Sequence, residues 1–301
     1  MGMTKGSNIT KKQHYIPQVY LRGFSPEYER NKIDLPVPKY TIYCYDLSVQ
    51  NQISKAIPIK SVCYEDDLYE VTNINEERIL TNYLERLFSA LEKRFSTYRH
   101  ELEKKVFIRD NYKTKCFLSK EEKVFWVTYI VVQILRMPQI LEIAENVSQE
   151  TLEINAEQAK NIAIFLCLPF FRKMEEDNKE VVIFNALINS MKDMSIGVGV
   201  DRQKKMITSD KPVFIYHTGD FWGEEYESVI FPITSEICLF FLGKEEKKRC
   251  PKNFLFEIDD AQREVVFKAM VDSSFGKIYS NHLLDTKEQR FVEEVLMEKE
   301  V

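Results

Sequence analysis

The segment from residue 13 to residue 25, QHYIPQVYLRGFS, gathers side chains that could bind an anion and move a proton. The chain has only four histidines, and His14 is one of them. Its imidazole has an unperturbed pKa of about 6.5, which suits proton transfer at neutral pH. In an extended segment fixed by Pro17, His14 and Gln18 face the same side, and Arg22 supplies a planar guanidinium for an oxyanion. We therefore predict His14 as a general acid or base, with Gln18, Tyr20 and Arg22 as substrate-binding residues.

A second group is Gln133 and Arg136, which lie three residues apart and therefore on one face of an otherwise apolar helix. A buried guanidinium is costly unless it is paired or binds an anion. We predict that Arg136 stabilises charged substrate oxygens, with Gln133 as a substrate-binding residue. On the preceding predicted helix, Glu77 or Glu85 could pair with Arg136, but their spacing lets only one face inward. Glu77 is the preferred choice, either for that pairing or for a metal site.

The third group is the turn Thr-Ser-Asp-Lys-Pro at residues 208–212, between two apolar stretches. Asp210 lies at the predicted end of a strand, where its carboxylate could orient His14 or hold a metal together with one glutamate. Ser209 is predicted to contact the substrate. The sequence does not decide whether a divalent metal takes part.

Each group also has a structural interpretation. His14 could cap a turn while its aromatic neighbours seal the core. Arg136 could form an ion pair between two helices. Asp210 could bond its own backbone, which is ordinary chemistry for an aspartate before a proline.

Several functional classes are disfavoured by what the sequence lacks. It contains no dinucleotide-binding or phosphate-loop motif, no metalloprotease motif and only nine glycines. Its six cysteines are scattered, so neither a zinc site nor a set of disulfides is indicated. The net charge of −5 disfavours a long nucleic acid and leaves a nucleotide or a locally held strand end as partner.

The pattern of apolar residues predicts an α+β protein, with a central helical bundle packed on a mainly antiparallel sheet that N-terminal and C-terminal strands form together. Expected strands lie at 40–47, within 56–71, and at four or five places in 195–243. Expected helices are 73–103, 119–137, 140–171 with a break near Pro169, 174–191 and 259–278. We expect one domain over 1–301, divided into an N-terminal part (1–70), a helical region (71–192), strands (195–243) and a C-terminal helix (259–278).

The longest apolar run, residues 124–135, has about a dozen residues, whereas a membrane span needs about 20. The N-terminus is polar and carries no secretory signal pattern. A cytoplasmic protein without a membrane partner is therefore expected. Association of the apolar helices into a homo-oligomer stays open.

The three segments HYIPQVYLRGF, QILRMP and MITSDKPV resemble the motifs of the bacterial domain-of-unknown-function 4238 family. The resemblance covers the chain from about residue 13 to about residue 279, and the first motif is the most specific. It implies one recurring polar constellation. The matching positions are His14, Tyr15, Pro17, Tyr20, Leu21, Phe24, Gln133, Arg136, Pro138, Ser209, Asp210 and Pro212, with Glu77 or Glu85 as a glutamate.

The resemblance implies an effector or sensor of anti-phage defence, without an established reaction. Our leading hypothesis is a hydrolase that acts on a phosphodiester or nucleotide, with His14 oriented by Asp210 and with Arg136 and Gln133 on the phosphoryl oxygens. The alternative is a sensor or binding module that recognises a phage component or a small anion in the same pocket without chemistry.

Overall fold

A computed structural model of the chain describes residues 10–28, 39–49, 55–73, 75, 77–79, 81–108, 117–167, 182–217, 226–243 and 253–299. The described elements fall into helical and strand-rich blocks, with antiparallel pairs dominant among the strands. The α+β class is therefore confirmed. The helical block comprises α2 (Tyr83–Ile108), α3 (Lys120–Leu135), α4 (Pro138–Leu152), α5 (Ala156–Cys167) and α6 (Val182–Lys192).

A five-stranded sheet comes entirely from the C-terminal part of the chain, in the order β10-β5-β9-β8-β7. Neighbouring strands are antiparallel except β10 and β5, which run parallel. The strands are β5 (Ser195–Val200), β7 (Phe214–His217), β8 (Tyr226–Pro232), β9 (Ile237–Leu242) and β10 (Asn253–Glu257).

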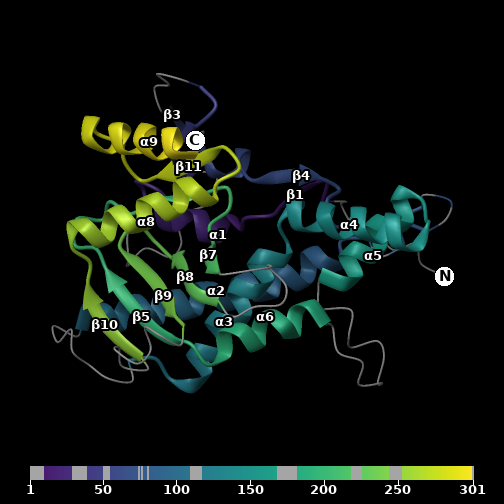
Figure 1. Ribbon diagram of the computed structural model, residues 1–301, viewed down its shortest axis with the longest axis horizontal. Coiled ribbons are helices and arrows are strands. Elements are labelled where there is room, and N and C mark those ends of the chain that lie inside the picture. Colours follow the sequence, from purple (N-terminus) through teal and green to yellow (C-terminus); the bar gives the residue numbers. More distant parts are fainter. Residues whose placement is uncertain are drawn as a thin grey trace.

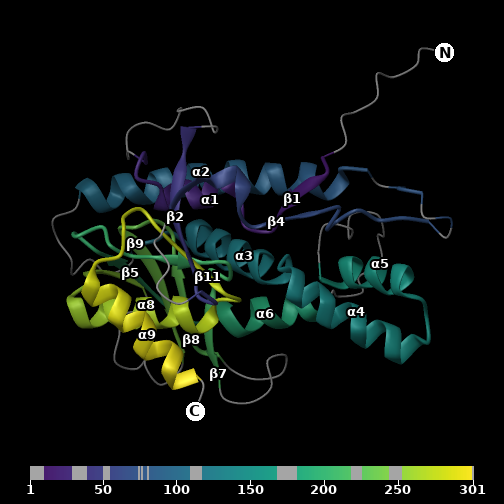
Figure 2. The ribbon, with the colours of Figure 1, turned by 90° about the horizontal axis from the view of Figure 1, so that it is seen from above.

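The two faces of this sheet contribute to two different hydrophobic clusters, because side chains alternate along a strand. On β9, Leu239 and Phe241 pack with residues of α2 and α3. Cys238 and Phe240, from the opposite face, pack with α8 (Asp260–Ser273) and α9 (Thr286–Lys299). The sheet thus lies between two helical layers, as Figure 2 shows.

Strands from both ends of the chain join in a second sheet, with the order β3-β2-β11-β6 and only antiparallel pairs. Its members are β2 (Thr41–Asp46), β3 (Lys55–Pro58), β6 (Thr208–Ser209) and β11 (Lys277–Ser280). The expected union of N-terminal and C-terminal strands is found here. The single sheet of the prediction is nevertheless replaced by two larger sheets and a small third one, which pairs β1 (Lys12–His14) with β4 (Tyr64–Asp66).

Helix α3 occupies the centre of the molecule and has the boundaries that its local signals predict. Ser119 caps its N-terminus, and the Ser119 and Glu122 side chains bond each other's backbone amides. The helix ends at Leu135, and Pro138 begins α4, where a missing amide hydrogen costs nothing. Figures 1 and 2 show α4 and α5 extending from the end of α3, away from the five-stranded sheet.

Two predicted helices of the helical region have different boundaries. Asn73 does not cap α2: its side chain instead accepts hydrogen bonds from the amides of Asn75 and Glu77, so the chain turns and the helix begins only at Tyr83. The third predicted helix is two helices, because Glu153 takes a left-handed conformation after α4. The predicted break near Pro169 and the start of the fourth helix at residue 174 lie outside the described residues.

The C-terminal region also differs from the prediction. Helix α8 ends at Ser273, and Gly276, with φ of +141°, leads into β11, which pairs with β2. The prediction extended this helix to residue 278 and did not include α9.

Among the described residues, no single helix has the length and apolar character to cross a membrane. Helices α3 and α4 meet that criterion only when they are taken together, and they are bent by 62° where they join.

Candidate functional site

His14 lies at the end of β1, immediately before the chain turns into a short helix. The extended conformation expected for residues 14–18 ends at Pro17, the N-cap of α1 (Gln18–Leu21). This turn brings Gln18 Nε2 to 3.3 Å from His14 Nε2. The ring also packs against the Tyr64 ring, with 5.5 Å between their centroids. The predicted pairing of His14 with Gln18 is thus present, although a helix start and not an extended strand produces it.

The pKa of His14 is lowered to about 4, mainly by burial and in part by the positive charges of Arg136 and Lys12, while a hydrogen bond to the Lys60 backbone opposes the change. The imidazole is therefore neutral at pH 7. A neutral ring satisfies both neighbours when one nitrogen donates to the Lys60 backbone and the other accepts from Gln18.

Arg136 is buried, with a relative exposure of 2%, and its side chain contacts other protein groups. Its Nη2 donates to the backbone carbonyl oxygen of His14, and its Nη1 lies 3.4 Å from Glu92 Oε1. The guanidinium stacks over the Phe88 ring, 4.0 Å from the centroid. Both terminal nitrogens are thus engaged by the protein, so this residue positions the His14 segment.

Two glutamates of α2 lie near Arg136. Glu92 forms the ion pair, and Glu85 lies seven residues earlier, hence on nearly the same helical face. The pKa of Glu85 is raised to about 7, mainly by burial and in part by the Glu92 and Glu70 carboxylates, while the Arg136 charge opposes the rise. At neutral pH a substantial fraction of Glu85 is therefore protonated.

Arg22, at the start of the 3-10 turn η1 (Arg22–Phe24) that follows α1, is a further half-buried polar side chain near these groups. Its guanidinium lies 5.3 Å from the centroid of the Tyr40 ring, and burial lowers its pKa while the Glu92 charge opposes that change. We call the set His14, Gln18, Arg22, Glu85, Glu92 and Arg136 the polar row.

Several buried atoms of the polar row have no hydrogen-bond partner in the part of the chain that the structure describes. These atoms are Gln18 Oε1, Arg22 Nε, Glu85 Oε1 and Arg136 Nε. Buried polar atoms are normally satisfied, so such a group of unmet atoms is typical of a place where water or a ligand binds.

Gln133, Tyr20 and Ser209 lie outside the polar row and connect segments of the chain. Gln133 Nε2 donates to the Tyr15 carbonyl oxygen at 2.8 Å. The buried Tyr20 hydroxyl donates to the Pro232 carbonyl oxygen and contacts Thr208 Oγ1, both at 2.7 Å. Ser209 Oγ donates to the Lys211 carbonyl oxygen, also at 2.7 Å.

Asp210 contacts backbone amides and not the His14 ring. Its two carboxylate oxygens accept from the amides of Phe275 and Lys277, at 2.8 and 3.1 Å. Burial raises its pKa to about 6, against these hydrogen bonds. This geometry ties the turn after β6 to the strand β11, whereas the partners of His14 are Gln18 and the Lys60 backbone.

Glu77, the glutamate preferred from the sequence, lies in the turn before α2. It accepts a hydrogen bond from Asn73 Nδ2 at 2.9 Å. The carboxylate paired with Arg136 is that of Glu92, which the sequence analysis missed. The available signal was the seven-residue spacing from Glu85, which places both on one face of a helix that begins later than predicted.

Among the described residues, no group of three or more histidine, cysteine, aspartate or glutamate side chains could hold a metal ion. The described cysteines Cys44, Cys63, Cys167 and Cys238 are free thiols. Burial raises the pKa of each of these four thiols, so they have little thiolate character at neutral pH.

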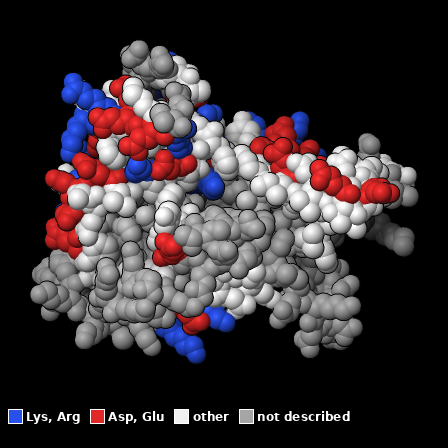
Figure 3. Space-filling view, viewed as in Figure 1, with Lys and Arg blue, Asp and Glu red and all other residues white. Residues whose placement is uncertain are grey.

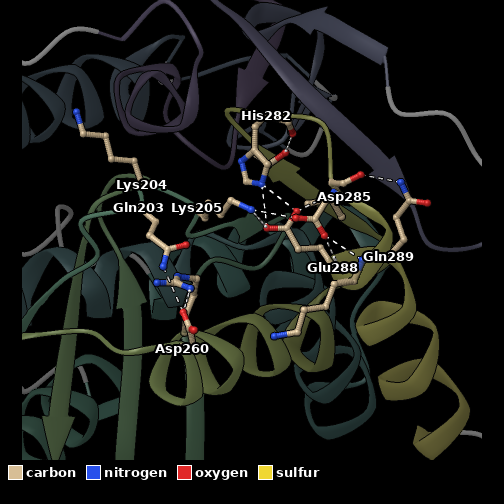
Figure 4. Close-up of polar contacts among 12 residues, drawn as sticks. Gln203, Lys204, Lys205, Asp260, His282, Asp285, Glu288 and Gln289 are labelled. Atoms are coloured by element: carbon tan, nitrogen blue, oxygen red, sulfur yellow. Dashed lines mark hydrogen bonds and ion pairs between the residues drawn. The ribbon is translucent and has the colours of Figure 1, made fainter.

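A second polar cluster connects α8, α9 and the loop after β5, and Figure 4 shows it in close-up. His282 Nε2 lies 3.1 Å from Glu288 Oε1, and Lys205 Nζ lies 3.0 Å from Asp285 Oδ2. The buried Asp201 accepts two hydrogen bonds from Arg263 and further ones from backbone amides. These groups pair with one another, which is the pattern of a structural ion network.

The fold and the polar row define an α+β protein with a half-buried group of ionisable side chains held between its N-terminal turn and helices α2 and α3. The family model of the DUF4238 proteins of unknown function matches residues 12–283, and the chain belongs to this family. No match was found to a curated protein or to a solved structure.

Proposed function

We propose that the chain is a hydrolase that acts on a phosphodiester or nucleotide, with proton transfer in the polar row. The observation that carries this proposal is that Arg136, which bonds the His14 carbonyl oxygen and pairs with Glu92, lies near two half-buried groups with opposite pKa shifts. The pKa of His14 is lowered to about 4 and that of Glu85 is raised to about 7, and the Arg136 charge acts on both. Such divergent pairs are typical of sites that assign separate roles to two ionisable groups.

Glu85 is the better suited of the two for proton transfer at neutral pH, because its pKa lies close to that pH. His14 stays neutral, and the hydrogen bond that its ring accepts from Gln18 orients this side chain, whose unpartnered Oε1 accepts a hydrogen bond from the substrate. Arg22 binds the phosphoryl oxygens, since its half-buried guanidinium has an unpartnered Nε among the described residues. Arg136 holds the His14 segment in place through its hydrogen bond to the His14 carbonyl oxygen.

A small substrate fits this proposal better than a long polyanion. The net charge is −5, and the carboxylates Glu85 and Glu92 lie in the row itself. Figure 3 shows acidic and basic side chains intermixed over α8 and α9, with no continuous basic patch on the described part of that face. A nucleotide or a single strand end is thus the proposed substrate, and the resemblance described above supports our proposal of a role in anti-phage defence in the cytoplasm.

The test is turnover of labelled RNA, DNA and free nucleotides at trace protein, each with and without Mg²⁺ or Mn²⁺. Glu85→Gln and His14→Gln are the variants that test the site. Glu77→Gln is the matched control, because the Glu77 carboxylate lies in the turn before α2. The proposal expects loss of turnover in the first two and wild-type turnover in the control. Equal turnover in all variants, or none by the wild-type protein with any substrate, would contradict it.

A binding module without chemistry is the second candidate. It is favoured by the fact that Arg136 and Asp210 use their polar atoms on other protein groups. In that case an anion would bind to Arg22, whose Nε is an unmet donor in the row, and a protonated group of the same ligand would donate to Gln18 Oε1. One of the same RNA, DNA or nucleotide probes should then raise the melting temperature at stoichiometric concentration without forming product, and Arg22→Gln should remove this shift.

A further inference from the structure

A cavity separate from the polar row lies between the end of α3 and the strand β7. Its volume is about 190 Å³. A closed apolar cavity of about 150 Å³ accommodates benzene, so this one has room for a ring with a short substituent. None of the proposed proton-transfer residues lines it, and the inference below does not depend on the proposed function.

The walls of the cavity are mainly apolar. Ile134 and Met137 belong to the end of α3 and the turn after it, Ile140 to α4, and Val213 and Ile215 to the β7 region. All except Ile215 have exposures of 8% or less. A ligand inside would therefore gain mainly by burying apolar surface, at roughly 25 cal/mol per Å².

Lys211 is the one cation that lines this cavity among the described residues. Its ammonium lies 5.4 Å from the centroid of the Phe275 ring, and no ion pair or hydrogen bond of this ammonium is found in the described part of the chain. Burial and the nearby Lys299 charge lower its pKa, against the charge of Asp210. A half-buried ammonium without a carboxylate partner beside an apolar cavity is a suitable site for an anionic group.

The position of Lys211 is fixed by its neighbours. Its amide donates to Ser209 Oγ at 3.2 Å, and its carbonyl accepts from Ser209 Oγ and Ser273 Oγ at 2.7 and 3.1 Å. Asp210 attaches the same turn to the amides of Phe275 and Lys277. The ammonium is thus carried by a rigid turn, which reduces the entropy lost on binding.

The remaining charges around the cavity do not prevent binding of an anion. Asp272 lines it, but Lys299 Nζ lies 4.0 Å from Asp272 Oδ1 and donates to the Asp272 carbonyl oxygen. The Asp210 carboxylate is turned to backbone amides. Gln133 also lines the cavity while its amide nitrogen is held by the Tyr15 carbonyl oxygen.

We propose that this cavity binds a small carboxylic acid with an apolar body. The carboxylate pairs with the Lys211 ammonium near Phe275, and the apolar body fills the space between α3 and β7. Because Gln133 and Arg136 hold adjacent carbonyl groups of the His14 segment, a ligand in this cavity touches the same helix end that supports the polar row.

The test is calorimetric titration of the full chain with three probes of similar size. These are phenylacetate, neutral phenylacetamide and cationic phenethylamine. The proposal expects phenylacetate to bind at least about tenfold more tightly than phenylacetamide, which corresponds to about 1.4 kcal/mol, and phenethylamine to bind more weakly still. Equal affinity for the acid and the amide, or no binding of any probe, would overturn it.

Two variants locate the binding. Lys211→Met keeps the side-chain length and removes the charge, so it should abolish the preference for the acid, while Lys93→Met, at an exposed lysine of α2, should leave it intact. Ile140→Phe fills the cavity without touching Lys211 and should weaken all binding, which provides a second readout if Lys211→Met does not fold. Unchanged phenylacetate affinity in both variants would exclude this cavity.

Discussion

The Arg136 guanidinium donates a hydrogen bond to the backbone carbonyl oxygen of His14, across 122 residues of sequence. Gln133, one helical turn earlier, makes the same kind of contact with the next carbonyl, that of Tyr15. The Gln-x-x-Arg pair of α3 therefore holds the backbone of the N-terminal segment and in this way sets where the His14 ring lies. Arg136 also pairs with Glu92 on α2, so one side chain joins three elements.

Arg136→Met should destabilise the protein by about 3–5 kcal/mol, because it leaves the Glu92 carboxylate and the His14 carbonyl without their cation. Adding Glu92→Gln should recover part of this loss. Urea unfolding of the single and double variants measures the coupling, with Arg86→Met at an exposed position of α2 as a control. Strictly additive effects would show that the ion pair carries no coupling energy.

Tyr20→Phe should lower the free energy of unfolding by about 1–2 kcal/mol, because the buried hydroxyl contacts both Pro232 and Thr208. Tyr216→Phe, at a side chain with 53% exposure, should have no measurable effect. Thermal unfolding of both variants gives the comparison, and equal melting temperatures would mean that the two hydrogen bonds contribute nothing net. Turnover should not change in either variant, because neither hydroxyl belongs to the polar row.

Gly23→Ala should be destabilising by about 1–3 kcal/mol, because a Cβ at this position would lie 2.8 Å from the Ile233 carbonyl oxygen. The Gly23 carbonyl also accepts from the Ser235 amide, so this close approach is held by a hydrogen bond and cannot open freely. Denaturant unfolding measures the loss. A variant as stable as the wild-type protein would show that the contact relaxes without cost.

The pH dependence of stability should report the environment of Glu85. Its pKa is raised from the usual 4.5 to about 7 in the folded protein, so the folded protein binds more protons than the unfolded chain between these values. The contribution of Glu85 to the free energy of unfolding is therefore full below pH 4.5 and is lost as the pH rises through 7. The loss amounts to about 2 kcal/mol at most, once the partial exposure of the side chain is allowed for. Subtracting the Glu85→Gln profile from the wild-type profile isolates this slope, and a difference independent of pH would contradict the raised pKa.

The parts of the fold that the sequence predicts well are those with local signals. Helix α3 has a capping box at Ser119 and a proline after its end, and both act within a few residues. The start of α2 could not be predicted, because Asn73 caps a turn as readily as a helix. The parallel pairing of β10 with β5 is set by tertiary contacts and leaves little local trace.

For the candidate site, residue types indicated the segments that meet but not their partners. The His14 segment contacts Gln133 and Arg136 through its backbone carbonyl oxygens, whereas the predicted contact of the His14 ring with Asp210 is replaced by other partners. The partner carboxylate could not be predicted, because the phase of α2 depends on where that helix begins. Asp210 is turned to the amides of Phe275 and Lys277, which lie just before β11 and at its start, whereas the sequence predicted a helix through both residues.

The proposed site depends most on a neutral His14 in the same polar row as the protonatable Glu85, and nuclear magnetic resonance tests the state of His14 without a known substrate. Only four histidines contribute ring signals, and His14→Gln identifies the relevant one. Titration from pH 3 to pH 8 should give a midpoint of about 4 for His14. A midpoint at or above the usual value of 6.5 would show a charged, solvated imidazole and would contradict the proposed site.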